Sequence, residues 1–464
     1  MGKTKAKNDI RKELSRKAVA TALAGTLLFG SGAMINEAEA YSFREPTVTL
    51  EEYNDYKGVK IFINGRLVEF NDKLGYPFIE HNRTMIPLRA VAETFDACVN
   101  WNSKSRRAYV AKDNEYVRIT IGEKEIKLYD ENYRSKTYKM DVEAIIRNNR
   151  TYIPLRAVFE CFGMKVRWDK NTRIAHIETL DETSFENIDF KDKKVFSIQD
   201  IDLDNVGKIM YDGVEVDKSY VEILKNSNQY KVVEDEGVTY IFSYQYLRNL
   251  NFVYGKLKEC MSNSLEGQDT NINFQSDETM DFFEYRLLAL NGDQIFCISN
   301  DEITAGNLHS YRLSYGEYGR KALSKAKEIA KDIKSQTNDP VEQIRLANKY
   351  LCDNVEYGSW LSAYGALLEG DAVCQGYDAA FAYIMRYLGI PCFGIDGHIP
   401  KRGPHVWSNV YVNGEWKVVD VTWNDDGYKN DDYLLLDLDD SKLSQRVIHR
   451  PDDDFIFRLT YKFN

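Results

Sequence analysis

The chain has 464 residues, of which 43% are hydrophobic and 13% aromatic, and this content is sufficient for packed cores in two or more domains. Its formal net charge is −11. Such an acidic chain gives no support for nucleic-acid binding, because contacts with the phosphate backbone need a basic surface.

The first 40 residues have the three regions of an export signal. Seven basic residues precede an apolar stretch from Ala18 to Ile35, and Ala38-Glu39-Ala40 follows as a small-residue cleavage site. Removal of residues 1–40, whose net charge is +3, leaves a mature chain near −14. We therefore expect a secreted protein that is extracellular or associated with the cell surface. An uncleaved membrane anchor is the alternative.

An internal repeat follows this segment. The stretch Arg83-Thr-Met-Ile-Pro-Leu-Arg-Ala-Val91 recurs 67 residues later as Arg150-Thr-Tyr-Ile-Pro-Leu-Arg-Ala-Val158, and Trp101 recurs as Trp168. Each copy predicts a short strand, then a helix with proline in its first turn, then a pair of strands around the tryptophan.

The two copies resemble the copper amine oxidase N-terminal-like (stalk) domain of secreted bacterial proteins, over residues 59–180. Copper is not expected, because this region contains only His81 and His176 as imidazoles and has no paired Cys/His spacing. A structural or envelope-contacting module is our interpretation. The repeated Arg89 and Arg156 are predicted to cap or brace the repeats, with a recognition patch as the alternative.

Residues 181–319 form an intermediate region of unknown role. Short strands are predicted at Tyr230–Val233 and Val238–Phe242, and amphipathic segments at Tyr246–Leu257 and Phe282–Leu290. Because the repeats have their own apolar periodicity, we expect a chain that begins near residue 181 to fold without them.

The last region, residues 320–464, contains Cys374, His405 and Asp420 in separate local settings. Cys374 precedes a helix that ends at Gly389. Its apolar stripe consists of Tyr377, Phe381, Ile384 and Leu388. A thiol at a helix N-terminus is favoured as thiolate, and the free N–H groups there could hold an oxyanion.

Asn413-Gly414 is a two-residue hairpin signal between two predicted strands, the second running through Trp423. If this turn closes the hairpin, alternation brings one set of side chains to a single face. That set is His405, Trp407, Asp420 and Thr422. His405 and Asp420 are then diagonal neighbours within reach of each other. The pattern predicts a cysteine-nucleophile triad.

These residues resemble the transglutaminase-like (papain-like) superfamily, in its bacterial secreted branch. The matching blocks are Val373-Cys374-Gln375-Gly376-Tyr377, Leu388-Gly389-Ile390-Pro391, His405-Val406-Trp407, Gly414-Glu415-Trp416 and Val419-Asp420-Val421-Thr422-Trp423. One departure concerns a supporting contact: the family often has Asn directly after the Trp of the His block, whereas here Ser408 stands there and Asn409 follows.

The resemblance implies an α+β, papain-like C-terminal domain in which a Cys on a helix N-terminus packs on an antiparallel sheet. A small α+β tandem-repeat domain precedes it. We expect cysteine-dependent acyl transfer on peptide or side-chain amides through a thioester, as protease, amidase or transglutaminase. The alternative is a non-catalytic cell-envelope binding or scaffolding protein that retains this fold. Further candidates for substrate-binding or oxyanion roles are Trp360, Tyr364, Gln375 and Trp407.

The expected partner is a protein or peptide substrate, for which a cell-envelope component is a candidate. We expect neither a cofactor nor a metal, because the chain contains no H-E-x-x-H and no C-x-x-C. An acidic loop is interpreted as solvated, because its spacing matches no EF-hand, with calcium binding as the alternative. It consists of Asp425, Asp426, Asp431 and Asp432. The oligomeric state and the acyl acceptor stay open.

Overall fold

The computed structural model describes residues 46–460 apart from 113–114, 131, 180–181, 186–187, 192, 267, 269, 275–282, 284–294, 300–308, 426–430 and 449–450. The predicted export signal, most of the predicted segment Phe282–Leu290 and Asp426 lie outside the described residues. None of the helices in the described part combines the length and apolarity that a membrane span requires.

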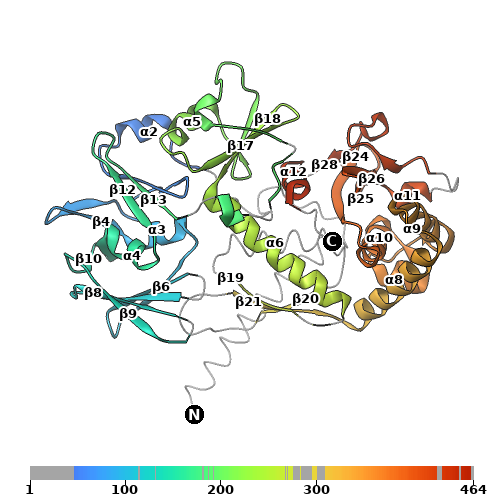
Figure 1. Cartoon of the computed structure of the whole chain (residues 1–464), viewed down its shortest axis with the longest axis horizontal. Helices are drawn as coiled ribbons and strands as arrows, with labels where there is room; N and C mark the ends of the chain where they lie inside the picture. Colours follow the sequence, from blue (N-terminus) through green and yellow to red (C-terminus); the bar gives the residue numbers. More distant parts are fainter. Residues whose placement is uncertain are drawn as a thin grey trace, which may run out of the picture.

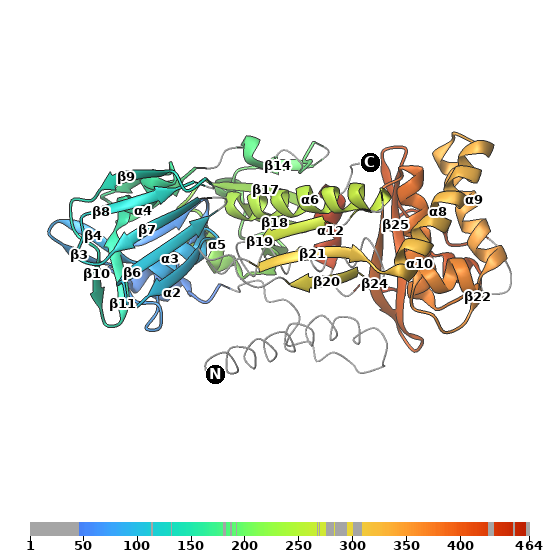
Figure 2. The same ribbon diagram turned by 90° about the horizontal axis from the view of Figure 1, so that it is seen from below.

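The molecule is elongated, with the repeats at one end and the C-terminal part at the other (Figures 1 and 2). The long helix α6 (Tyr244–Leu265) runs between them. The fold is of the mixed α+β class, as predicted.

The repeat part (residues 46–179) confirms the predicted strand–helix–strand order in both copies. Its elements are α2 (Leu50–Asp55), β1 (Lys60–Ile63), β2 (Arg66–Leu67), β3 (Phe78–Glu80), β4 (Arg83–Pro87), α3 (Leu88–Thr94), β5 (Cys98–Asn102), β6 (Arg107–Lys112), β7 (Glu115–Thr120), β8 (Glu125–Tyr129), β9 (Ser135–Lys139), β10 (Ile145–Arg147), β11 (Arg150–Pro154), α4 (Leu155–Cys161), β12 (Lys165–Asp169) and β13 (Ile174–Glu178).

The two copies are intertwined. Strand β4 of the first copy pairs with β11 of the second, with Ile86 opposite Ile153. Phe95 and Phe159, one from each copy, pack with ring centroids 5.5 Å apart in one shared core. Each copy therefore buries its apolar helix face against the other.

The middle part (residues 182–315) confirms the two predicted strands and the first amphipathic segment, as β17, β18 and α6. Its sheet has the order β14-β17-β18-β15-β16. Its strands and its remaining α-helix are β14 (Lys194–Phe196), β15 (Lys208–Tyr211), β16 (Val214–Glu215), α5 (Lys218–Leu224), β17 (Tyr230–Asp235), β18 (Val238–Ser243), β19 (Thr270–Phe274), β20 (Ile295–Ser299) and β21 (His309–Tyr315).

The C-terminal part (residues 316–460) places helices α8, α9 and α10 against a sheet of order β27-β26-β25-β24-β28 (Figure 2). Its α-helices and strands are α8 (Glu317–Gln336), α9 (Pro340–Asn354), β22 (Glu356–Tyr357), β23 (Asp371–Ala372), α10 (Cys374–Leu388), β24 (Cys392–Ile399), β25 (Gly403–Val412), β26 (Glu415–Val419), α11 (Val421–Asn424), β27 (Leu434–Leu436), β28 (Val447–Ile448) and α12 (Pro451–Thr460).

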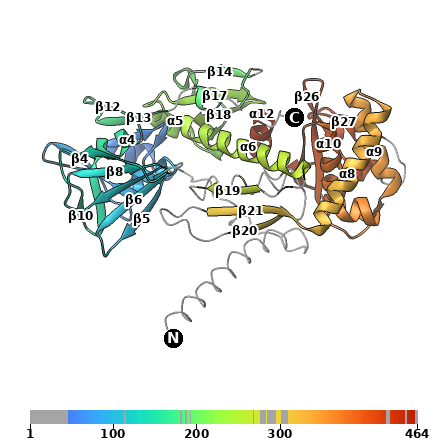
Figure 3. The ribbon, with the colours of Figure 1, turned by 60° about the horizontal axis from the view of Figure 1, so that its bottom comes forward.

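Buried clusters join these parts. Tyr53 and Phe62 of the repeat part share a core with Ile209 and Ile241 of the middle part. The last helix, α12, lies between the middle sheet and the C-terminal sheet, where Phe455 stacks on Tyr240 at a centroid distance of 4.1 Å (Figure 3). Because the repeat and middle parts share a core, we now expect the folding of a chain that begins near residue 181 to depend on the repeats. This is the opposite of the expectation from the sequence.

Candidate active site

Cys374 is the first residue of α10, as predicted, and it is half-buried. Glycine is required at Gly376 in the next turn, because a Cβ there would lie 2.8 Å from both the Ala372 Cβ and the Trp360 carbonyl oxygen. The helix start is thereby pressed against the preceding loop. The stripe also ends as predicted, at Gly389 in the left-handed conformation (φ 80°).

The hairpin that carries His405 has the predicted register. Asn413 and Gly414 both have positive φ, and the pairs run from Val412↔Glu415 to Ser408↔Val419. His405 lies on β25, opposite Gly397 of β24.

The predicted continuation of the second strand through Trp423 is wrong. Strand β26 ends at Val419, and Asp420 is the N-cap of the short helix α11, where its Oδ1 accepts the Trp423 backbone N–H at 3.1 Å. Aspartate is a favoured N-cap residue, so this local bond competes with continuation of the strand. Thr422 is consequently a helical residue.

His405 and Asp420 nevertheless meet as predicted. His405 Nε2 lies 2.7 Å from Asp420 Oδ2, and both side chains are buried. Burial by itself lowers the pKa of His405, but the bond to Asp420 and the contact with the Cys374 thiol outweigh it and raise the pKa to about 9. With Nε2 committed to Asp420, Nδ1 is the ring nitrogen left for Cys374.

Arg446, which the sequence did not single out, binds the same carboxylate oxygen. Its Nη2 lies 2.5 Å from Asp420 Oδ2, and its side chain is 3% exposed. The guanidinium also lies 4.7 Å from the ring centroids of both Trp407 and Trp423. Asp420 is therefore shared between an imidazole and a guanidinium. Arg446 lies 26 residues beyond Asp420 and belongs to no recognised motif, so no sequence signal marked it.

A second buried carboxylate, Asp378, lies one turn after Cys374 in α10. It accepts the Ser408 hydroxyl at 2.5 Å. Burial raises the pKa of Asp378 to about 7, with the charge of Asp420 adding to the increase and the Ser408 bond opposing it. Ser408, which stands where the family often has Asn, is therefore hydrogen-bonded to Asp378.

The loop beside Cys374 is aromatic. The Tyr357 side chain is in contact with Cys374: burial and then the thiolate charge raise the pKa of Tyr357, and a bond from the Cys374 backbone N–H opposes the increase. Trp360 is 38% exposed, and its ring lies 5.7 Å from that of Tyr364. Gln375 is half-buried in the first turn of α10.

Trp407, the remaining candidate for substrate binding, is 4% exposed and packs in the core between the C-terminal sheet and the middle part. Trp407 therefore packs against the Arg446 guanidinium and supports it. Of the acidic loop, Asp425 accepts the Tyr377 hydroxyl, and Asp431 accepts from Arg345 and Asn348. These carboxylates already have partners within the protein.

Two family models match the chain. Residues 327–421 match the transglutaminase-like superfamily, and residues 62–177 match the copper amine oxidase N-terminal domain. The resemblances to these two families are confirmed, whereas secretion stays a prediction, and the first range contains Cys374, His405 and Asp420. The C-terminal part is a transglutaminase-like domain.

Among curated proteins, the chain is similar to kyphoscoliosis peptidase of Homo sapiens (24% identity over 122 residues) and of Mus musculus (23% over 116 residues). These matches cover 22% and 21% of this chain and 18% of each relative, so the chain spans less than a fifth of their length.

Solved structures with similar parts include a proposed cysteine protease from Cytophaga hutchinsonii, with 15% identity, 39% of this chain and 68% of that chain covered, and a TM-score of 0.22. The periplasmic domain of TgpA from Pseudomonas aeruginosa has 17% identity, 27% and 59% coverage, and a TM-score of 0.19. A structure titled as a TGase has 13% identity, 50% and 79% coverage, and a TM-score of 0.21.

The transglutaminase-like match thus contains a cysteine, a histidine and an aspartate that the fold brings to one site.

Proposed function

We propose that this protein transfers acyl groups from peptide or side-chain amides through a thioester on Cys374. The observation that carries the proposal is the buried pair of His405 Nε2 and Asp420 Oδ2 at 2.7 Å, with the Cys374 thiol in contact with the same imidazole. A raised His405 pKa favours an imidazolium beside a thiolate, which is the nucleophilic form of the pair.

In the first step, the Cys374 thiolate attacks the amide carbonyl and a tetrahedral oxyanion forms. The positive end of the helix dipole at the start of α10 can stabilise this charge. His405 then donates its proton to the leaving amine, and the thioester remains. Asp420 keeps the imidazole oriented throughout.

In the second step, water or an amine resolves the thioester, with His405 taking the proton of the attacking group. Water makes the protein a protease or amidase, and a lysine amine makes it a transglutaminase. The same three groups serve both outcomes, because the difference lies in which acceptor enters the site.

Mass spectrometry can test the proposal and separate these outcomes. The full chain is incubated with envelope peptides and a labelled primary amine in H2¹⁸O. Uptake of ¹⁸O at a new carboxylate identifies hydrolysis, and uptake of the amine identifies transfer. Cys374→Ala must abolish both products.

His398 offers a control for His405. It lies half-buried on β24 of the same sheet, opposite Pro404. We expect His405→Ala to abolish acyl transfer and His398→Ala to retain most of it. If neither hydrolysis nor amine transfer is detected and Cys374 stays unmodified, the result supports the alternative, a non-catalytic envelope-binding protein.

We further propose that the protein acts outside the cytoplasm on a protein or peptide substrate. The support is the signal-like composition of residues 1–40. Edman sequencing of the mature protein from its host should begin at Tyr41, and an N-terminus at Met1 or Gly2 would contradict this proposal.

A further inference from the structure

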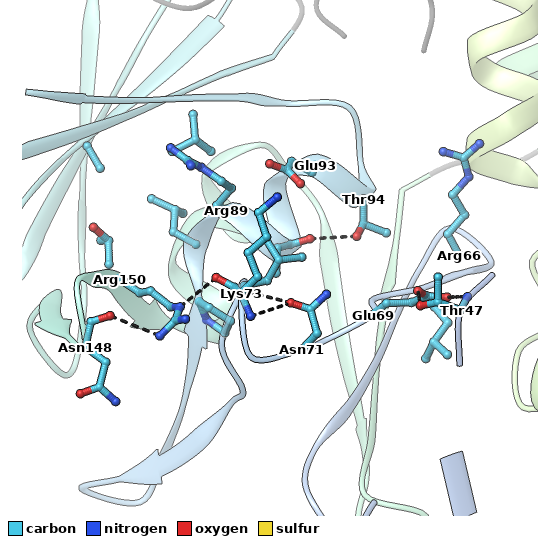
Figure 4. A pocket seen from close by; sticks show the side chains of 18 of the residues that line it. Thr47, Arg66, Glu69, Asn71, Lys73, Arg89, Glu93, Thr94, Asn148 and Arg150 are labelled. Carbon is cyan, nitrogen blue, oxygen red and sulfur yellow. Dashed lines mark hydrogen bonds between the residues drawn. The ribbon is translucent and has the colours of Figure 1, made fainter. Parts of the chain in front are cut away.

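A pocket of about 990 Å³ opens in the repeat part, at the end of the molecule opposite the C-terminal part (Figures 1 and 4). Both copies of the repeat line it, and so does the middle part through Tyr211 and Tyr220. Its volume is at the upper end of the range for ligand sites, about 300–1,000 Å³. No catalytic role involves this pocket.

The pocket uses the two copies of the repeat unequally. Arg89 and Trp101 of the first copy line it, whereas their counterparts Arg156 and Trp168 do not. Trp168 packs against the shared core, but Trp101 is 37% exposed. The same motif thus supplies a packing residue in one copy and a pocket-lining residue in the other.

Two cationic side chains of the pocket, Arg89 and Lys73, are available to bind a ligand. Arg89 and Lys73 are exposed, and their side-chain nitrogens bind no residue that the structure describes. The pocket position of Arg89 favours the alternative of a recognition residue over a bracing role. Two further cations of the lining have partners: Arg150 donates to the carbonyl oxygens of Lys73 and Asn148, and Arg66 pairs with Asp212 (Figure 4). These groups stand out in a chain with a net charge of −11.

The rest of the lining mixes acceptors and donors with the aromatic side chains of Trp101, Tyr211 and Tyr220. Glu69, Glu93 and Asp212 contribute carboxylates to the lining, and Asn71, Asn148 and Thr94 contribute groups that accept and donate (Figure 4). Sugar hydroxyls likewise both donate and accept. An exposed indole such as that of Trp101 provides a flat apolar face for the C–H face of a sugar ring.

We infer that this pocket binds an acidic oligosaccharide. Its carboxylate or phosphate groups are placed at Lys73 and Arg89, and one sugar ring lies on Trp101. Arginine matches a carboxylate or phosphate with two parallel hydrogen bonds, which makes Arg89 the main recognition residue. The enzyme would thereby be held on an acidic polysaccharide while the C-terminal part acts elsewhere.

Isothermal titration and tryptophan fluorescence of the full chain test this inference. The probes are tetragalacturonate, which carries carboxylates, and a phosphorylated oligosaccharide of the same length, so that the two anionic groups are distinguished. A neutral tetrasaccharide and an acidic peptide serve as comparisons. We expect one of the anionic sugars to bind, to quench tryptophan emission and to bind more weakly as salt is added.

The repeat offers matched variants. Arg89→Ala should weaken binding by roughly 10-fold to 100-fold, which is the range for losing a charge-assisted hydrogen bond, whereas Arg156→Ala should leave it unchanged. Trp101→Ala should remove the fluorescence change. Cys374→Ala should bind as the unmodified protein does, so a failure of the catalytic proposal would not affect the result.

The inference is overturned if Arg89→Ala and Arg156→Ala weaken binding equally, or if the neutral sugar binds as tightly as the anionic ones. It is also overturned if the acidic peptide binds as tightly with the same dependence on Arg89, which would make the pocket a peptide site. Absence of binding by both anionic sugars at millimolar concentrations overturns it as well.

Discussion

At the scale of single residues, the reactivity of Cys374 comes from its surroundings. It begins a helix and touches His405, whereas Cys161 and Cys392 are buried in the folded protein. Burial raises the pKa of Cys161 to about 12 and raises that of Cys392 strongly. Competitive iodoacetamide labelling below neutral pH, read by peptide mass spectrometry, should therefore modify Cys374 first. Earlier modification of the half-buried Cys98 would contradict the assignment.

The pKa of His405 predicts two pH dependences. The imidazolium form of His405, and with it the rate of acyl transfer, should decline as pH rises through about 9, because the leaving amine then lacks its proton donor. Asp420→Asn should move this decline to lower pH, because the bond to Asp420 is the largest of the contributions that raise the pKa. Acyl-transfer rates across pH 5–11 measure both, and an unchanged profile in the variant would contradict the role of Asp420.

The pH dependence of the free energy of unfolding should also reflect the raised pKa of His405. The folded protein holds a proton on His405 that the unfolded chain loses near pH 6.5, so folding is favoured fully below that pH and the gain disappears as pH rises through about 9.

Arg446 predicts a stability effect. Removing one partner of a buried ion pair leaves an incompletely compensated charge, so Arg446→Met should lower the free energy of unfolding by roughly 3 kcal/mol. Arg345 provides a control, because its pair with Asp431 has side chains 46% and 54% exposed. Arg345→Met should change stability by less than about 1 kcal/mol. Equal effects in urea denaturation would show that Arg446 contributes nothing special.

At the scale of elements, the start of α10 depends on close packing. Gly376→Ala places a Cβ against Ala372 and the Trp360 carbonyl, so we expect a loss of about 1–3 kcal/mol and slower alkylation of Cys374. Gly255, in the interior of α6, offers a control, because a Cβ there would meet no neighbouring atom within 4 Å. Gly255→Ala should raise stability by about 0.5–1 kcal/mol. A Gly376→Ala variant with unchanged stability and alkylation would contradict the packing argument.

The short helix α11 shows how an element can alter a site without moving its key residue. The hairpin register runs to the pair Ser408↔Val419, directly before Asp420, and this much follows from the Asn413-Gly414 turn. The chain then leaves the sheet, and Asp420 uses one oxygen to cap α11 and the other to bind His405. Both bonds orient the carboxylate.

At the scale of the whole molecule, the repeat and middle parts are joined by polar contacts as well as by apolar packing. Gln245 and Asn249 of α6 donate to Asp96 of the repeat part, and Asn64 donates to Gln245. All four side chains are buried. A chain truncated to residues 181–464 would leave Gln245 and Asn249 without these partners and would expose the shared apolar core.

We therefore expect residues 181–464 alone to bind a hydrophobic dye and to melt at a lower temperature than the full chain. Calorimetry and dye fluorescence measure this. Cooperative unfolding at the temperature of the full chain, without dye binding, would show that the interface contributes little to folding.

The sequence by itself determined the features that depend on local order along the chain. The helix start at Cys374, the hairpin turn at Asn413-Gly414 and the duplicated strand–helix unit follow from glycine conformations, apolar periodicity and repetition, which act over a few residues.

Only the tertiary structure decided how distant segments meet. Arg446 reaches Asp420 because β28 pairs with β24 at the edge of the sheet, and α12 joins the C-terminal sheet to the middle part. Arg89 faces a pocket while its repeat counterpart does not, because the middle part packs against one side of the intertwined copies. Contacts of this kind depend on long-range packing, which leaves no periodic signal in the sequence.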